Sequence, residues 1–268
     1  FIRSGKRVVS VSQPGKAVLE ISERILRDVQ NIKNIGSEFT DHDSGSLTIA
    51  TTHTQARYAL PKIVAEFVKN YPKVNLTIKQ GSPSAIAQMV SSGEADLAII
   101  TERIDDHPEL GKLPCYEWNH AVIVPHDHPL LDCRNPLSLE DLASFPLVTY
   151  EFAFNSGSSI ARTFNKAHIE QPDVALSAAD TDVLKTYVRL GLGVGLMAKM
   201  AYDPVVDQDL QLIDAAHLFE PSPTWIALRT DTYLRGYAYD FIQMFAPKLT
   251  REAVDRILYT PVVEDFSI

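Results

Sequence analysis

The chain has few cysteines and no long apolar run. Cys115 and Cys133 are its two cysteines among 268 residues, and they form neither a CxxC pair nor a disulfide-dense pattern. Such sparse usage is typical of a reducing cytoplasm. No apolar run approaches the roughly 18 residues that a membrane-spanning helix needs, and no secretory signal follows Phe1. We therefore expect a cytoplasmic protein without a membrane partner.

Basic residues are also scarce. The chain has 25 Lys and Arg against 34 Asp and Glu, so its formal net charge is −9. Binding to nucleic-acid phosphates requires clustered Lys and Arg. Such residues gather only at Arg3, Lys6 and Arg7, so we expect no specific DNA binding by this chain alone. Its 45% hydrophobic residues are enough for a globular core of one large domain or two medium ones.

Catalytic signatures are absent from the sequence: it has no GxSxG elbow, Walker loop or HExxH pair. His126 and His128 are possible metal ligands, but Pro129 follows them and a surface loop is the simpler interpretation. Cys115 is a possible nucleophile, but a buried, inert thiol is the simpler interpretation there. We expect no enzymatic activity, no cofactor and no metal.

Residues 14–36 have the pattern of one helix, with Pro14 suited to its first turn. Apolar residues recur at steps of three and four, at Val18, Ile21, Ile25, Val29 and Ile32. A narrow apolar stripe on a polar helix is typical of a coiled-coil seam. The stripe favours self-association through this helix, with packing on its own domain as the alternative.

Strand and helix patterns alternate from Gly45 onward. One βαβαβ series runs over residues 47–100, a second runs over 121–198, and a late strand and helix cover 226–246. Such alternation predicts right-handed crossovers in doubly wound sheets. We therefore predict an α/β fold of two Rossmann-like lobes with a cleft between them, similar to type 2 periplasmic binding proteins and preceded by a linker helix. The expected segments are 14–36 for the linker helix, 45–118 with 222–268 for lobe I, and 119–221 for lobe II.

Four strand-to-helix turns are rich in hydroxyls, amides or carboxylates, at residues 51–55, 80–84, 155–159 and 180–182. Each turn can supply an N-cap side chain with free backbone N–H groups behind it. Capping alone explains any single turn. Several of them at strand ends predict a shared cleft for a small anion, held by N–H dipoles and neutral hydroxyls. Since such a site needs no formal charge, we expect affinity that depends only weakly on salt.

Several residue strings resemble LysR-type transcription regulators. The opening FIRSGK with the following QPG is similar to the end of their winged helix-turn-helix, which implies that residues 1–13 are a remnant of the wing. The strings ATTHTQARYALP (50–61), KTYVRL (185–190) and DFIQMFAP (240–247) resemble the CysB subgroup more specifically. The resemblance covers nearly the whole chain.

The resemblance implies the effector-sensing domain of a regulator of sulfur assimilation and cysteine biosynthesis genes. Its effector would be N-acetylserine, O-acetylserine, sulfate or thiosulfate, and promoter DNA would bind only to the full-length protein. A homo-oligomer, either a dimer or a tetramer, is also implied. The implied ligand-binding residues are Thr52, Thr54, Gln55, Ser82, Thr101, Trp118, Asn155 and Ser156. Asn155 stands where the subgroup usually has threonine, which leaves the preferred inducer open.

Two alternatives remain. A periplasmic-type solute-binding protein for a small anion shares the two-lobe fold, but it would need a signal peptide and would lack the wing and the coiled-coil helix. A two-lobe enzyme would need a general base or a metal in the cleft, whereas the hydroxyl-rich turns offer mostly neutral groups.

Overall fold

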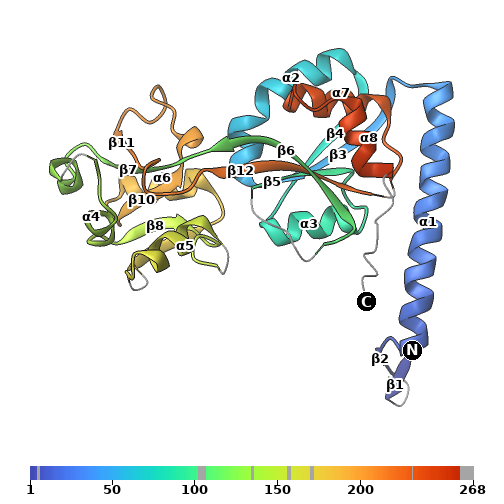
Figure 1. The fold of residues 1–268 in the computed structure, drawn as a ribbon, viewed down its shortest axis with the longest axis horizontal. Helices are drawn as coiled ribbons and strands as arrows, with labels where there is room; N and C mark the ends of the chain where they lie inside the picture. Colours follow the sequence, from blue (N-terminus) through green and yellow to red (C-terminus); the bar gives the residue numbers. More distant parts are fainter. Residues whose placement is uncertain are drawn as a thin grey trace, which may run out of the picture.

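Two five-stranded sheets covered by helices form two lobes, and a long helix stands beside one of them (Figure 1). The computed structural model describes residues 1–4, 7–101, 107–133, 136–155, 158–169, 172–230 and 232–259. Among these residues, no helix combines the length and the apolar character needed to cross a membrane. The two-lobe α/β fold expected from the sequence is confirmed.

The sheet of lobe I has the strand order β4-β3-β5-β12-β6. Its strands are β3 (Ser44–Thr51), β4 (Lys73–Gln80), β5 (Leu97–Ile100), β6 (Leu110–Trp118) and β12 (Ser222–Arg229). Strand β3 is parallel to β4 and β5, whereas β12 is antiparallel to β5 and β6. The helical elements are η1 (a π-helix, Gln55–Ala59), α2 (Pro61–Asn70), α3 (Pro83–Ser91), α7 (Gly236–Phe245) and α8 (Arg251–Tyr259).

Helices cover both faces of this sheet, and strand β5 is therefore apolar at every position. Leu97 and Ile99 belong to the core that includes Phe67 of α2 and Phe241 of α7. Ala98 and Ile100 belong to a second core on the opposite face, under α3. A strand buried on both faces cannot alternate apolar and polar residues, and its continuous apolar run follows from this position.

The sheet of lobe II has the strand order β11-β7-β10-β8-β9. Its strands are β7 (His120–Pro125), β8 (Leu147–Tyr150), β9 (Val174–Ala178), β10 (Val194–Ala198) and β11 (Leu210–Asp214). The helical elements are α4 (Leu139–Ala143), α5 (Ser159–Lys166), α6 (Thr181–Arg189) and two 3₁₀ turns, η2 (Pro129–Asp132) and η3 (Lys199–Ala201). A Cβ atom at Gly195 would lie 2.5 Å from Ile123 and 2.8 Å from Val188, so β10 packs against α6 only with glycine there.

The chain passes between the two sheets twice, once directly from strand to strand and once through a turn. Strand β6 ends at Trp118 and β7 begins at His120, so one residue separates the two sheets at this point. The return runs from the end of β11 at Asp214 to the start of β12 at Ser222. These two connections form the back wall of the space between the lobes.

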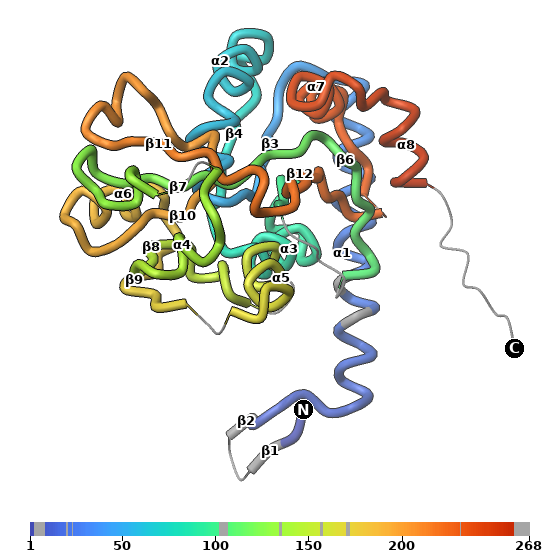
Figure 2. The backbone as a smooth tube through the Cα atoms, turned by 60° about the vertical axis from the view of Figure 1, so that its left-hand side comes forward, coloured from blue at the N-terminus to red at the C-terminus, as the bar shows by residue number. Residues whose placement is uncertain are grey.

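Helix α1 (Gln13–Thr40) follows the short hairpin of β1 (Ile2–Ser4) and β2 (Arg7–Ser10) and is longer at both ends than residues 14–36. Its C-terminal part is held on lobe I by the buried Arg235. The Arg235 Nε lies 2.6 Å from the Glu38 carboxylate, and Nη2 donates to the Asp41 carbonyl at 2.7 Å. The N-terminal half projects away from both lobes (Figure 2).

Large apolar side chains remain exposed along α1: Val18, Leu19, Ile21, Ile25, Leu26, Val29, Ile32, Ile35 and Phe39. Val18, Ile25, Ile32 and Phe39 recur every seven residues, which is the spacing of a coiled-coil seam. Asn31 and Glu38, which hydrogen-bond to lobe I, lie outside this seam. The seam is therefore uncovered by its own lobes, and we propose that a second copy of the chain covers it.

Replacing Ile25 and Ile32 together by Asp should weaken self-association, because each loses roughly 1.5–3 kcal/mol of burial if fully covered in the oligomer. Gln30→Asp with Ser37→Asp adds the same charge on the opposite side of the helix and should leave the oligomer intact. Sedimentation velocity over a concentration series measures both. Equal masses for the two double variants would contradict self-association through α1.

Candidate functional site

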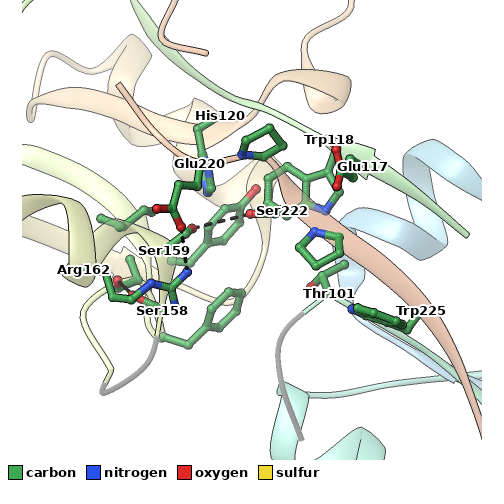
Figure 3. Close-up of a pocket in the computed structure, with 16 residues that line it drawn as sticks. Thr101, Glu117, Trp118, His120, Ser158, Ser159, Arg162, Glu220, Ser222 and Trp225 are labelled. Atoms are coloured by element: carbon green, nitrogen blue, oxygen red, sulfur yellow. Dashed lines mark hydrogen bonds and ion pairs between the residues drawn. The ribbon is translucent and has the colours of Figure 1, made fainter. Parts of the chain in front are cut away.

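A cavity of about 320 Å³ lies between the lobes, against the connections that join them (Figure 3). Thr101 and Trp225 contribute to it from lobe I, and Ser158, Ser159 and Arg162 contribute from lobe II. Its polar or aromatic lining also includes Glu117, Trp118, His120, Tyr150, Phe152, Glu220 and Ser222. A concave space with converging polar groups from two lobes is the usual form of a small-molecule site.

The start of α5 faces this cavity. The Ser158 hydroxyl accepts a hydrogen bond from the Ala161 N–H at 3.0 Å and donates to the Ala153 carbonyl, so it is occupied as a cap. The Ser159 hydroxyl lies 3.5 Å from that of Ser222, at the start of β12. Arg162 follows in the first turn of α5, and its Nη2 lies 3.6 Å from the Glu220 carboxylate. This wall therefore offers hydroxyls and one cation.

The Trp118 and His120 side chains flank the crossing from β6 to β7, with ring centroids 4.8 Å apart. The indole Nε1 of Trp118 and the Nδ1 of His120 are buried and lack a hydrogen-bond partner among the described residues. Burial lowers the pKa of His120 from 6.5 to about 4, so its imidazole is neutral at neutral pH. Each unpaired polar atom opposes folding of this arrangement.

The lobes also meet directly beside the cavity, through three buried hydroxyls that we call the hydroxyl cluster: Thr54, Tyr150 and Thr181. The Thr54 Oγ1 lies 2.9 Å from the Thr181 Oγ1 and 3.4 Å from the Tyr150 hydroxyl oxygen. The Tyr150 and Thr181 oxygens are 3.0 Å apart, and the Tyr150 oxygen also accepts from the Ala198 N–H. Thr54 comes from lobe I and the other two from lobe II, so the cluster fixes the lobes against each other.

Ionisable groups flank the hydroxyl cluster. His53 Nε2 lies 3.0 Å from Asp180, and Arg57 Nε lies 2.5 Å from Asp182. We call these two pairs the polar clasp. One ligand atom each from His53, Asp180 and Asp182 lies within 4.8 Å of the others. These atoms already serve the clasp and the cap of α6, where Asp180 accepts from the Asp182 N–H at 2.7 Å.

Tyr58 extends this contact into lobe II. Its hydroxyl donates to Asp182, and Lys185 Nζ donates to the Tyr58 oxygen at 3.2 Å. Lys185 is itself buried and paired with buried Asp207 at 2.6 Å. Burial and then the bond to Asp182 raise the pKa of Tyr58 above its ordinary value of 10. The tyrosine is therefore a stable hydrogen-bond donor between the lobes.

Of the ligand-binding residues implied by the sequence, some line the cavity, some follow strand β3, and the others lie elsewhere. Thr101 and Trp118 line the cavity. Buried Thr52, Thr54 and Gln55 follow strand β3. Thr54 does not line the cavity itself but hydrogen-bonds to Tyr150, which belongs to both the hydroxyl cluster and the cavity wall.

Gln55 and Ser82 have other partners. Gln55 accepts from the Tyr116 hydroxyl, while its Nε2 lies 3.9 Å from the sulfur of Met200 in lobe II. Ser82 caps α3 at the Ala85 N–H, 3.4 Å away. It does not line the cavity.

Asn155 is exposed. Its backbone N–H donates to the Phe152 carbonyl at 3.1 Å, and Asn155 does not line the cavity wall in the described residues. Ser156 lies outside the described residues. Sequence reasoning missed Tyr150, His120, Arg162 and Glu220. The position of Arg162, four residues after the Ser158 cap, was the available signal, since i and i+4 share a helix face.

The low pKa of His120 predicts a loss of stability in acid. An unfolded histidine takes up its proton near pH 6.5 and the folded one only near pH 4, so stability is complete above pH 6.5 and falls as the pH drops toward 4. Between pH 7 and pH 5 this group should lower the free energy of unfolding by about 2 kcal/mol. Urea titrations should show that His120→Gln loses less stability than the parent over this range.

Exposed His126 provides the matched control, because His126→Gln should keep the pH dependence of the parent. If His120→Gln shows the parent's full decline in acid, His120 is not the group responsible.

Comparison with known proteins agrees with this architecture. The family model described as the LysR substrate binding domain matches residues 40–250. The chain is 49% identical to the "HTH-type transcriptional regulator SsuR" of Burkholderia cenocepacia, over 96% of this chain and 83% of that protein. It is also 49% identical to the regulator CysB of the same organism, over 96% of this chain and 82% of that protein.

A solved structure, the cofactor-binding domain of the Cbl transcriptional regulator, superposes with a TM-score of 0.74 at 39% identity. The superposition covers 81% of this chain and 95% of that domain. These matches confirm the resemblance stated from the residue strings, and the chain belongs to the LysR-type transcription regulators, among relatives named CysB, SsuR and Cbl.

Proposed function

We propose that this chain is the effector-sensing part of a bacterial regulator of sulfur assimilation and cysteine biosynthesis genes. The effector would be an acetylserine or a sulfate-like anion bound between the lobes. The observation that carries the proposal is the cavity itself, whose walls come from both lobes and from the connections between them. The similarity to regulators named CysB and SsuR supports the choice of pathway.

We assign lobe I to residues 45–118 with 222–268, of which 260–268 lie outside the described residues, and lobe II to residues 119–221. Effector contacts are proposed at Thr52, Thr54, Gln55, Thr101 and Trp118, with Ser82, Asn155 and Ser156 as outer contacts. Thr101 and Trp118 support this assignment because they line the cavity, and Thr54 supports it because Tyr150 links it to the same wall. Ser82 and Asn155 do not line the cavity, so contacts from them would require a movement of α3 or of Asn155.

The effector would act by shifting the relative orientation of the lobes. A ligand that contacts both lobes binds one orientation better than others and shifts the population toward it. Arg235 connects lobe I to α1. In an oligomer assembled through α1, a rotation of lobe II relative to lobe I would therefore change the position of lobe II relative to the partner subunit. DNA binding would belong to the full-length regulator, since this chain has a net charge of −9.

The assignment is tested by calorimetry with N-acetylserine, O-acetylserine, sulfate and thiosulfate in parallel. At least one should bind, and none should be turned over. Binding of none of the four would reject the proposed pathway, and release of acetate from O-acetylserine would favour an enzyme.

Thr52→Val keeps the β-branched shape and removes the hydroxyl. Binding should weaken by about 0.5–1.5 kcal/mol if the contacted ligand group is neutral, or by about 1.5–3 kcal/mol if it is charged. Thr77→Val makes the same change at an exposed position of strand β4 and should leave the affinity unchanged. If Thr52→Val binds every ligand as tightly as the parent, Thr52 does not contact the effector.

A further inference from the structure

The polar clasp brings metal-ligating side chains of both lobes to one point. His53 directly follows Thr52 at the end of β3 in lobe I, whereas Asp180 is the cap of α6 and Asp182 lies in its first turn, in lobe II. One ligand atom of each residue lies within 4.8 Å of the others. Neither lobe supplies this set alone, so the three side chains meet only while the lobes are in contact.

The closest pair has a separation that suits a metal ion. The His53 Nε2 and the Asp180 Oδ2 are 3.0 Å apart. Two ligands that each lie about 2.1 Å from an ion are roughly 3.0–3.4 Å apart in octahedral or tetrahedral coordination. The Nδ1 of His53 is buried, so Nε2 is the nitrogen that an ion can reach. The side chains of His53, Asp180 and Asp182 are 18%, 38% and 39% exposed, so solvent has access to the cluster.

Each carboxylate uses one oxygen within the protein and turns the other toward the cluster. The Asp180 Oδ1 accepts the cap hydrogen bond from the Asp182 N–H at 2.7 Å, while its Oδ2 faces His53. The Asp182 Oδ1 accepts from the Tyr58 hydroxyl, while its Oδ2 faces Arg57. An ion bound to the two Oδ2 atoms would therefore leave both the cap of α6 and the Tyr58 contact in place.

Arg57 is the group that an ion would displace from Asp182. The Arg57 side chain is 56% exposed, and an ion pair this open to solvent contributes little to stability. The guanidinium also lies 5.7 Å from the centre of the Tyr58 ring, a contact that does not depend on Asp182. A divalent cation carries twice the charge of the guanidinium and can bind His53 as well. It can therefore compete with Arg57 for this carboxylate.

We propose that His53, Asp180 and Asp182 bind a Zn²⁺-like transition-metal ion, which takes the place of Arg57 and links the two lobes. Imidazole favours such ions over Mg²⁺ and Ca²⁺, which take oxygen ligands. Water would complete the coordination. The proposal departs from the absence of a metal expected from the sequence. It is independent of the effector cavity, so its failure would leave the proposed function unchanged.

Calorimetry of the metal-free chain with Zn²⁺, Co²⁺ and Mg²⁺ tests the site. The parent should bind one Zn²⁺ or Co²⁺ per chain, and Mg²⁺ at least about ten-fold more weakly. Because the ion binds only the folded chain with its lobes in contact, Zn²⁺ at one hundred times its Kd should raise the melting temperature by about 5 °C.

His53→Gln removes the ligand of lobe I and should weaken Zn²⁺ binding at least about ten-fold, since loss of even an outer-shell partner has an effect of this size. Asp180→Asn should also weaken binding, while asparagine preserves the cap of α6. Arg57→Gln removes the competing cation and should bind Zn²⁺ about two- to five-fold more tightly than the parent. A gain of affinity from this substitution is not expected if the clasp is merely structural.

His107→Gln is the matched control. His107 pairs with Glu109 at 3.1 Å, with side chains 20% and 39% exposed, but no third ligand of this kind joins them among the described residues. This variant should bind Zn²⁺ as the parent does. Circular dichroism melts without metal establish that each variant is folded.

The proposal is refuted if the parent binds no Zn²⁺, or if Mg²⁺ binds as tightly as Zn²⁺, which would indicate general attraction to a chain of net charge −9. Unchanged Zn²⁺ affinity in His53→Gln would show that other groups, such as the cysteine thiols, hold the ion. Loss of binding in Asp180→Asn but not in His53→Gln would confine the ion to lobe II and refute the link between the lobes. Weaker binding in Arg57→Gln would contradict the displacement of Arg57.

Discussion

The hydrogen bonds that join Thr54, Tyr150 and Thr181 set the relative orientation of the lobes. The three side chains are between 0% and 9% exposed, so their hydroxyls cannot turn to water as long as the lobes stay in contact. An unpaired buried hydroxyl is unfavourable by about 1–3 kcal/mol, so each depends on the presence of the other lobe. The cavity exists at its observed shape because this contact holds its two walls in place.

The direct contact between the lobes is mostly polar, apart from the Tyr58 ring that packs against the core of lobe II, and it lies at one side of the cavity. The polar clasp and the Tyr58 hydroxyl surround the hydroxyl cluster there, while on the cavity side the Trp118 and His120 nitrogens find no partner in the part of the chain that the structure describes. Polar contacts of this kind can be exchanged for water when the lobes separate, unlike a large apolar interface. These polar groups therefore fix the geometry of the two lobes while they are in contact. Because the groups can exchange their partners for water, the binding energy of a small ligand is enough to shift the lobe orientation.

Local patterns were sufficient for most of the fold. The apolar run Leu97–Ile100 and the stripe of α1 both follow from periodicity, because each depends on neighbours in the same element. Strands β6 and β11 were not predicted. Strand β6 lies at a sheet edge and includes Lys112, Pro114 and Glu117, so its pattern lacks a regular alternation. Helix α1 continues past Gly36 because Glu38 gains the buried contact with Arg235, which lies far along the chain.

The site was less accessible to sequence reasoning, because it depends on how two lobes face each other. Capping patterns identify Ser82 and Ser158 equally well, yet one caps α3 away from the cavity and the other lies on its wall. Which turn faces the cleft is decided by the contact at Thr181, at the start of α6. Tyr150 could not be assigned from β8 alone, since its role comes from Thr54 of the other lobe.

The position of α1 connects these local contacts to the assembly. Arg235 is 7% exposed and holds both the Glu38 carboxylate and the Asp41 carbonyl, so the C-terminal end of α1 moves with lobe I. Lobe II contacts lobe I through the hydroxyl cluster, the polar clasp, Tyr58 and the two strand connections. A change in lobe angle therefore displaces lobe II relative to the α1 seam. Any partner bound along that seam would meet lobe II at a different place, which links occupancy of a small cavity to the geometry of a whole oligomer.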